Sequence, residues 1–321
     1  MNFPLITATA MAMLAFAGNS VLCRLALEHG AIDPASFTSV RLVSGAIMLV
    51  ILVFLIPLLE TIKTFLLSSS KNTEKDIKNL HQSPESAFRQ KMSHFIKFNN
   101  SSWFGGLFLF AYAAGFSFAY ITLPAGTGAL ILFATVQITM LTYALINAVR
   151  LSGIQWFGLL IALLGLIYLF LPGISAPPLV GSLLMVVAGI SWGAYSILGK
   201  KVANAAQSSA ENFVRAIVPA IFLSLIFLSD ISMTTNGVLL AISSGAITSG
   251  IGYAIWYAVL PQLKAASAAS LQLTVPVIAT IGGVILLNEE VNIRLTIASI
   301  SILGGVALVV LMPKKTKNSA K

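Results

Sequence analysis

Polar and aromatic side chains interrupt the long apolar segments of this 321-residue chain, and they are the residues best suited to bind a small molecule. In apolar surroundings each polar group costs free energy unless it finds a partner or a water-filled cavity. We therefore predict that these residues face one cleft as a group, although packing or lipid contact is an alternative role for any single aromatic ring. The set comprises Asn19, Gln137, Trp192, Tyr195, Tyr253, Trp256 and Gln272.

Catalytic and metal chemistry are not indicated. The stretch GISWG (189–193) matches the GxSxG nucleophile pattern, but that chemistry needs a strand-to-helix turn with a downstream Asp and His. This match lies in an apolar segment, and no histidine follows His94. His29, His81 and His94 lack metal-ligand spacing, and the single cysteine, Cys23, excludes an intramolecular disulfide and a CxxC site. We expect no catalytic residue, no metal site and no cofactor.

Two arginines, Arg41 and Arg215, fall near the starts of apolar segments. A long basic side chain at such a position can extend along its helix until the charge reaches the membrane interface. The alternative is that the guanidinium contacts an anionic group of a substrate. The sequence leaves both interpretations open.

A proline lies in the middle of the apolar segment LQLTVPVIATIGGVILLNEEVN, residues 271–292. Inside a helix, proline costs about 3 kcal/mol or more and leaves the carbonyl four residues earlier without its usual donor. For Pro276 that carbonyl belongs to Gln272. Such a break either lines a cavity or is a packing kink whose carbonyl bonds a neighbouring Ser or Thr. Glu289 and Glu290 follow where the segment ends, and we interpret them as boundary charges first and functional groups second.

The segments that carry these residues are long enough to cross a membrane. Apolar residues make up 57% of the chain and charged residues 9%, and the mean hydropathy is +0.93. A membrane-spanning helix needs about 20 apolar residues, and runs of that length recur along the chain. The sequence predicts an all-α integral membrane protein with about ten transmembrane helices. We place them at 4–25, 36–59, 103–122, 125–147, 153–172, 179–199, 212–229, 235–259, 265–287 and 293–312.

The net charge of +9 does not indicate nucleic-acid binding, because of where the basic residues fall. With this set of helices, one side of the membrane collects all of the 19 Lys and Arg residues except Arg24, Arg41 and Arg294. Cytoplasmic loops are enriched in Lys and Arg, so both termini are predicted to be cytoplasmic. The segment 1–14 carries no Lys or Arg, which argues weakly against this orientation.

The two halves of the chain resemble each other. FAGNSVLCR (16–24) aligns with WGAYSILGK (192–200), and ASFTSVR (35–41) aligns with SAENFVR (209–215). Five helices per half is an odd number, so the second half is predicted to lie upside down relative to the first. Inverted repeats of this kind are a transporter architecture, with the substrate site between the halves.

We predict one repeat in residues 1–172 and the other in residues 173–321. An insertion of polar composition, residues 60–101, separates the second and third helices of the first repeat. It is predicted to be a cytoplasmic loop by composition. The basic and apolar residues near its end leave open a helix that lies on anionic lipid.

Several motifs follow one another along the chain in a particular order. They are Arg41, VRLSGIQWFGLLIALLG (149–165), WGAYS (192–196), GYAIWYAVLPQLKAASAASLQLTVPV (252–277) and LLNEEVN (286–292). Together these motifs resemble the ten-helix EamA-type branch of the drug/metabolite transporter superfamily. The likeness covers both halves outside the insertion.

The resemblance implies a protein that exports amino acids, nucleosides, other metabolites or drugs from bacterial cells. It also implies that Tyr112, on the third helix, joins the residues that line the central cavity. The chain departs from the family where Pro and Glu are frequent in the fourth helix, since Val136 and Val149 stand there. The second half keeps both, as Pro276 and Glu289.

We therefore expect an inner-membrane exporter of small molecules that works by alternating access, as a monomer or homodimer. A membrane enzyme is an alternative of another class, but no clustered nucleophile, base or metal set appears in the helices. A non-transporting scaffold is a third alternative, which only the insertion favours. No Asp or Glu lies within the core of a predicted helix, so facilitated diffusion and proton exchange through a boundary acid such as Glu289 both stay open.

Overall fold

The structure is a computed structural model that describes residues 3–55, 100–147, 151–173, 176–199, 204–263 and 265–311. Over these residues the chain is built from helices. Nine of the described helical segments are long and apolar enough to cross a membrane, and Trp103–Ala119 is a shorter apolar helix. The predicted all-α membrane protein is thus confirmed. Almost all of the predicted insertion lies outside the described residues.

The helices follow the predicted segments closely. The first half contains α1 (Phe3–Glu28), α2 (Pro34–Val50) with a π-helical extension η1 (Ile51–Leu55), α6 (Asn100–Ala119), α7 (Ala125–Ile146) and α8 (Gly153–Phe170). The second half contains α9 (Leu179–Gly199), α10 (Ala205–Ile226), η2 (Leu228–Asp230), α11 (Thr235–Ile242), η3 (Ser243–Ile251), α12 (Gly252–Val259), η4 (Leu260–Gln262), α13 (Ala265–Gln272), α14 (Thr274–Leu287) and α15 (Ile293–Leu311).

The start of α10 is where the sequence prediction was wrong. The apolar run predicted a helix from residue 212, but the structure starts it at Ala205. The Asn204 side chain caps this end, because its carbonyl oxygen accepts a hydrogen bond from the Gln207 N–H at 3.0 Å. The cap stabilises a polar first turn that hydropathy alone does not include.

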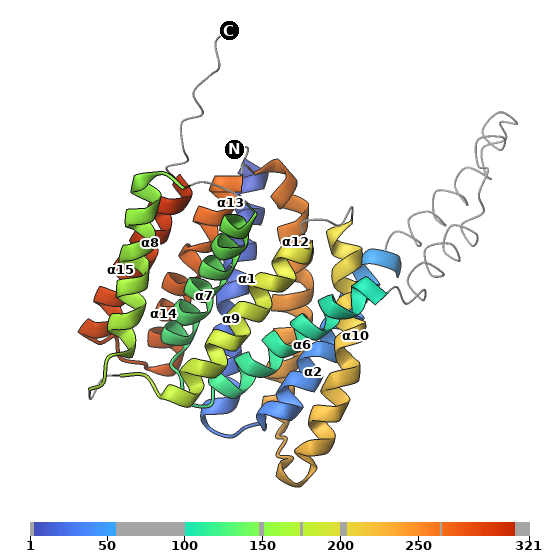
Figure 1. The fold of residues 1–321 in the computed structure, drawn as a ribbon. Helices are drawn as coiled ribbons and strands as arrows, with labels where there is room; N and C mark the ends of the chain where they lie inside the picture. Colours follow the sequence, from blue (N-terminus) through green and yellow to red (C-terminus); the bar gives the residue numbers. More distant parts are fainter. Residues whose placement is uncertain are drawn as a thin grey trace, which may run out of the picture.

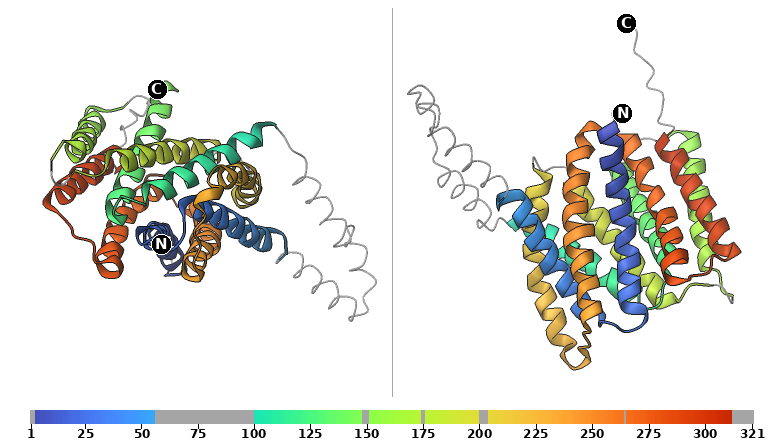
Figure 2. Two further views of the ribbon diagram at one scale, coloured as in Figure 1. Left: turned by 90° about the horizontal axis from the view of Figure 1, so that it is seen from below. Right: turned by 180° about the vertical axis from the view of Figure 1, so that it is seen from behind.

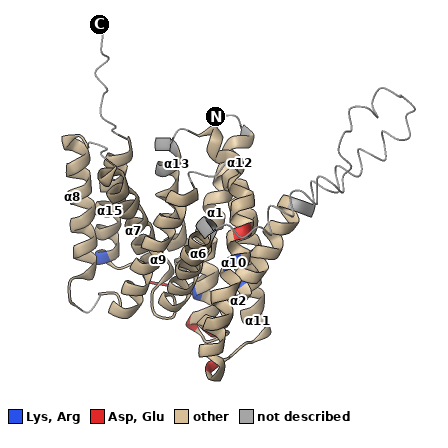
Figure 3. Cartoon of the chain, turned by 45° about the vertical axis from the view of Figure 1, so that its right-hand side comes forward, with Lys and Arg blue, Asp and Glu red and all other residues tan. Residues whose placement is uncertain are grey.

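The helices lie side by side in one bundle, with the start of α1 and the end of α15 at the same end (Figures 1 and 2). α2 packs against α10, α7 against α14, and α8 against α15. α6 packs against α9, while α1 packs against α14, η3 and α12. Charged residues are sparse over the described helices (Figure 3). Large apolar side chains are exposed on the outer faces, such as Trp156, which is 52% exposed on α8.

Glycines allow α8 and α15 to approach unusually closely. A Cβ atom added to Gly158 would lie 2.6 Å from the Gly305 carbonyl oxygen, and one added to Gly305 would meet the Gly158 carbonyl oxygen in turn. One added to Gly165 would lie 2.6 Å from the Ser301 Cβ. Small residues at such a contact let two helix backbones pack tightly within a membrane.

Asp33 and Pro34 determine where α2 begins. The Asp33 carboxylate accepts a hydrogen bond from the Ser36 N–H at 2.8 Å, and Pro34 occupies the first turn, where its missing N–H costs nothing. The same carboxylate accepts from the Ser232 N–H at 3.1 Å and so joins the start of α2 to the loop before α11. With this start, Arg41 lies about two turns inside the helix.

Candidate functional site

A cavity with about 1010 Å³ of empty space, including its open mouth, lies in the middle of the bundle. Its lining includes Gly199, Ala205 and Leu260. These residues lie at helix ends on the side of the bundle where α1 starts and α15 ends (Figure 1). The cavity therefore extends from the centre of the protein toward the end that carries both helix termini.

A narrower cavity adjoins the first and has about 410 Å³ of empty space when the open space beside it is included. The two share Trp192, Tyr253 and Gln272 in their linings. The narrower cavity adds Asn19 and Tyr112 and lies deeper in the protein. The two cavities together are called the central cavity below.

All the predicted binding residues except Tyr195 border the central cavity. They are Asn19, Tyr112, Gln137, Trp192, Tyr253, Trp256 and Gln272. They come from α1, α6, α7, α9, α12 and α13, so the fold brings together side chains from both halves of the chain. Their contact with a substrate stays a prediction.

Tyr195 lies behind the cavity wall. Its side chain is 4% exposed, and its hydroxyl forms a 3.0 Å hydrogen bond with the Ser209 hydroxyl on α10. Its ring stacks on that of Trp192, with centroids 5.3 Å apart and planes at 30°. Tyr195 thus supports the position of Trp192 and does not line the cavity itself.

Aromatic rings form one wall of the central cavity. The ring centroid of Trp192 lies 4.8 Å from that of Tyr112 and 5.3 Å from that of Tyr253. Phe16 meets Tyr253 edge to face at 5.8 Å and Trp256 at 5.9 Å. Such rings present apolar faces together with polar tips, which suits an amphipathic ligand.

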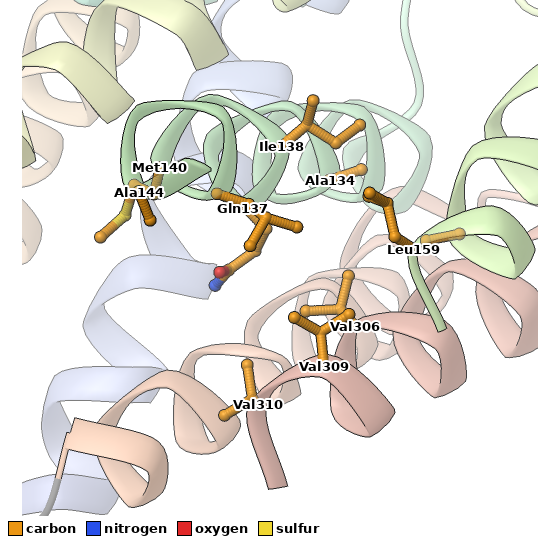
Figure 4. A pocket seen from close by; sticks show the side chains of 11 residues that line it. Ala134, Gln137, Ile138, Met140, Ala144, Leu159, Val306, Val309 and Val310 are labelled. Carbon is orange, nitrogen blue, oxygen red and sulfur yellow. The ribbon is translucent and has the colours of Figure 1, made fainter. Parts of the chain in front are cut away.

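Gln137 also borders a groove on the outer side of α7. Figure 4 shows its side chain extending from α7 toward α15, with Val306, Val309 and Val310 on the facing helix. This groove has about 690 Å³ of empty space and an apolar lining, and it shares Gln137 and Met140 with the central cavity. The amide of Gln137 is therefore placed between the cavity and the groove.

Asn19 connects three helical segments beside the cavity. Its amide donates to the Tyr112 hydroxyl on α6 at 3.2 Å. Its carbonyl oxygen accepts from the Ser244 hydroxyl at 2.6 Å and from the Thr248 hydroxyl at 3.4 Å. Ser244 and Thr248 both lie in the π-helical segment η3, and segments of this type often occur at functional sites.

Arg41 extends into this network from α2. Its Nη2 donates to the Tyr112 hydroxyl at 3.1 Å, and its guanidinium carbon lies 4.9 Å from the ring centroid of Phe116 and 5.1 Å from that of Tyr112. The residue is only 1% exposed. The interpretation in which Arg41 extends to the membrane interface is therefore wrong, because the side chain turns into the protein interior.

The contacts of Arg41 compensate its charge only in part. Guanidinium groups are always protonated in proteins, and burying an ion costs several kcal/mol. A desolvated cation–π contact returns about 2 kcal/mol, and a hydrogen bond to a charged group about 1.5–3 kcal/mol. The buried Nε and Nη1 atoms have no hydrogen-bond partner among the described residues.

Arg215 is buried as well, at 4% exposure, so it does not extend to the interface either. It differs from Arg41 in having a carboxylate one turn earlier on its own helix. Its Nη1 lies 3.3 Å from the Glu211 carboxylate. The charge of Arg215 is thus balanced within α10.

Glu289 closes the end of the bundle opposite the open mouth. Both of its carboxylate oxygens accept from the Ala125 N–H at 2.9 Å, at the start of α7. The Arg24 Nε lies 3.4 Å from the same carboxylate, and Arg24 also pairs with Glu28 at 2.7 Å. Another Arg24 nitrogen donates to the Ile121 carbonyl at 2.9 Å. Glu289 is therefore more than a boundary charge, because it connects α1, α7 and the end of α14.

The environment of Glu289 also affects its protonation. Burial raises the pKa of this carboxyl above its ordinary value, although the Ala125 N–H and the Arg24 guanidinium favour the charged form. Glu289 lies just beyond the spanning segment Ser270–Leu287. We call Glu289, Arg24 and Ala125 the polar clamp below.

The helix that carries Pro276 is broken three residues before the proline. The helix is interrupted at Leu273, directly after Gln272, and resumes as α14. The Thr274 hydroxyl donates to the Leu271 carbonyl at 2.6 Å, so a neighbouring threonine does bond one carbonyl of the break. The Gln272 side chain borders both parts of the central cavity. The break therefore lies beside the cavity, and both sequence interpretations of it stay predictions.

Sequence reasoning missed several residues of the site. Phe16, Ser244 and Thr248 line or support the cavity, yet small hydroxyl residues and phenylalanine are ordinary in membrane helices. The available signal was their spacing, because Phe16 lies one turn from Asn19, and Ser244 lies one turn from Thr248. The polar clamp was missed because the contact between Ala125 and Glu289 joins segments that are distant in sequence.

Comparison with known proteins now adds to this geometry. Residues 179–311 match the model of the EamA-like transporter family. An uncharacterised protein of Pseudomonas aeruginosa is 44% identical over 301 residues, which cover 94% of this chain and 92% of that protein. A solved crystal structure is similar with a TM-score of 0.60 and 18% identity, and covers 98% of this chain and 99% of that one. This last likeness concerns the fold alone.

Relatives with more informative names match part of the chain. An uncharacterised transporter of Bacillus subtilis is 24% identical over a region that covers 56% of this chain and 64% of that protein. A probable amino-acid metabolite efflux pump of Escherichia coli is 27% identical over a region that covers 53% of this chain and 62% of that protein. Together with the apolar helices of the described residues and the central cavity, these matches show that the chain belongs to the EamA-like transporter family, within the drug/metabolite transporter superfamily, and is a multi-pass membrane transporter.

Proposed function

We propose that this protein exports small amphipathic metabolites across the bacterial inner membrane by alternating access. The observation that carries the proposal is a central cavity with an open mouth at one end of the bundle and a polar clamp at the other. Alternating access needs this arrangement, with one side closed while the other admits substrate.

The charge distribution supports the direction of opening. The mouth lies at the end where α1 starts and α15 ends. By sequence, most Lys and Arg residues fall on the side of the predicted helices that holds both termini, which favours a cytoplasmic location for this end. The conformation in this structure would then be the one that takes up substrate from the cytoplasm. In this conformation the polar clamp closes the outer side.

The packing of the helices supports two inverted repeats, in residues 1–172 and 173–321. The two repeats make α2 equivalent to α10, α7 to α14 and α8 to α15. The two helices of each of these pairs pack against each other. A twofold axis between the halves would produce such pairs. The central cavity draws its lining from both halves, where a substrate site between repeats is expected.

The substrate class follows from the lining. Aromatic faces with a few amides and hydroxyls suit a small molecule that is part apolar and part polar. Amino acids and related metabolites are of this kind, and an amino-acid metabolite is what the Escherichia coli relative is named for. Nucleosides and drug-like amphiphiles are further members of the class.

Time-resolved uptake into proteoliposomes tests the proposal, with a panel of amino acids, nucleosides and amphiphilic drugs. Trp192→Ala should weaken the apparent affinity for transported compounds by about tenfold, because a cavity-facing aromatic contact is lost. Trp156→Ala is the matched control, since Trp156 lies on the outer face of α8 and should leave uptake unchanged. Wild-type vesicles that accumulate nothing from the panel would overturn the proposal.

A further inference from the structure

The two buried arginines occupy equivalent positions in the two halves of the chain but differ in their counter-charge. In the alignment of ASFTSVR (35–41) with SAENFVR (209–215), Arg41 pairs with Arg215 and Phe37 pairs with Glu211. Glu211 is the carboxylate that balances Arg215. Arg41 therefore has a phenyl ring where its counterpart has a negative charge.

None of the described residues around Arg41 supplies an anion in place of that carboxylate. The ionisable side chains that interact with it electrostatically are Tyr112, Tyr253 and Cys23. None of the ion pairs between described residues includes Arg41. The described protein thus gives this buried cation aromatic rings and one hydroxyl, and leaves its Nε and Nη1 without a partner.

The hydroxyl of Tyr112 links Arg41 to the central cavity. It accepts hydrogen bonds from the Arg41 Nη2 at 3.1 Å and from the Asn19 amide at 3.2 Å, which leaves its own hydrogen for a further acceptor. Tyr112 borders the deeper part of the cavity. An oxygen that accepts the Tyr112 hydrogen would lie within about 6 Å of the guanidinium, because both bonds share the hydroxyl oxygen.

We propose that Arg41 and the Tyr112 hydroxyl form an anion-recognition site in the deeper part of the central cavity, and that the transported molecules carry a carboxylate. The carboxylate accepts the Tyr112 hydrogen and places its charge beside Arg41. The apolar part of the molecule lies against Trp192 and Tyr253. The inference rests on the proposed transport function and assigns its substrate class.

A single negative charge fits this site best. Among the described residues around the cavity, the nearby cations other than Arg41 are already paired, Arg215 with Glu211 and Arg24 with Glu28 and Glu289. A ligand with two negative charges would leave one of them buried without compensation. A neutral ligand would leave the charge of Arg41 without a counter-charge.

The test compares compounds that differ only in this charge. Sodium hexanoate, benzoate and L-phenylalanine are each compared with the matching carboxamide, at constant ionic strength, by melting temperature of the purified protein in detergent. We expect at least the aromatic carboxylates to raise the melting temperature of the wild type, and the carboxamides to raise it less. Arg41→Gln should weaken apparent carboxylate affinity about tenfold to a hundredfold and abolish the preference over the carboxamide.

Two further variants keep the test independent of folding defects. Phe37→Glu introduces the carboxylate that the second half already has, so it should keep or raise the melting temperature without ligand and lose the response to carboxylates. Phe37→Gln is its neutral control and should retain the response. The double variant Glu211→Gln/Arg215→Gln removes a balanced pair elsewhere and should also retain it.

The outcomes separate this inference from the transport function. If no carboxylate stabilises the wild type more than its carboxamide, or if Arg41→Gln keeps the preference, the anion site is refuted. Vesicles that still transport neutral compounds would then leave the transport proposal intact. If carboxylates stabilise the wild type through Arg41 but no compound enters vesicles, the anion site stands and the proposed transport fails.

Discussion

At the scale of single residues, the structure assigns different roles to side chains that look alike in the sequence. Arg41 and Arg215 both precede long apolar runs, but only Arg215 has a carboxylate one turn earlier. The alignment of Phe37 with Glu211 already contained this difference. That Arg41 turns inward could not be predicted, because it depends on the rings of Tyr112 and Phe116, which come from another helix.

Glu289 gives a prediction about pH at this scale. Burial raises its pKa in the folded protein, so the folded state binds the proton more tightly than the unfolded state. The stability that protonation contributes is complete below the ordinary glutamate pKa and is lost as the pH rises through the raised value. Lowering the pH from neutral should therefore raise the melting temperature of the wild type relative to Glu289→Gln.

Melting curves of both proteins in detergent across this pH range check the prediction. Glu290→Gln removes a neighbouring exposed carboxylate and should follow the wild type. Parallel curves for the wild type and Glu289→Gln would contradict it.

At the scale of helices, apolar length predicted nearly every element. The limits of α9, α13–α14 and α15 agree with the predicted segments because each apolar run ends abruptly at polar residues. The π-helical form of η3 was not predictable. It occurs where Ser244 and Thr248 bond Asn19, and such tertiary contacts leave no local pattern.

The break before α14 gives the second prediction. Pro276→Ala restores a donor for the Gln272 carbonyl, so the helix should straighten and the melting temperature in detergent should not fall. Transport should fall nevertheless, because the helix that carries Gln272 beside the cavity loses its bend. Val277→Ala, at a position 46% exposed, is the control and should behave as the wild type. If Pro276→Ala kept the full transport rate and affinity, the functional interpretation would be wrong and the proline would be a packing kink.

At the scale of the whole molecule, the family was predictable from the order of motifs in two repeats, and the comparisons confirm it. The orientation in the membrane gives the third prediction. Reporter fusions after Leu311 and within residues 71–90 should behave as cytosolic, because most Lys and Arg lie on that side. A fusion within residues 173–178 should behave as exported. An exported reporter after Leu311 would contradict both the orientation and the number of spans.

The contact between α8 and α15 has a mechanical consequence for the transport cycle. Their backbones touch at Gly158 and Gly305, so neither helix can rotate against the other without driving a side chain into a carbonyl oxygen. Close-packed interfaces of this kind have discrete arrangements and do not deform continuously. We therefore expect the pair to move as one rigid body. We expect the hinges that exchange the open and closed ends to lie outside the contact between α8 and α15.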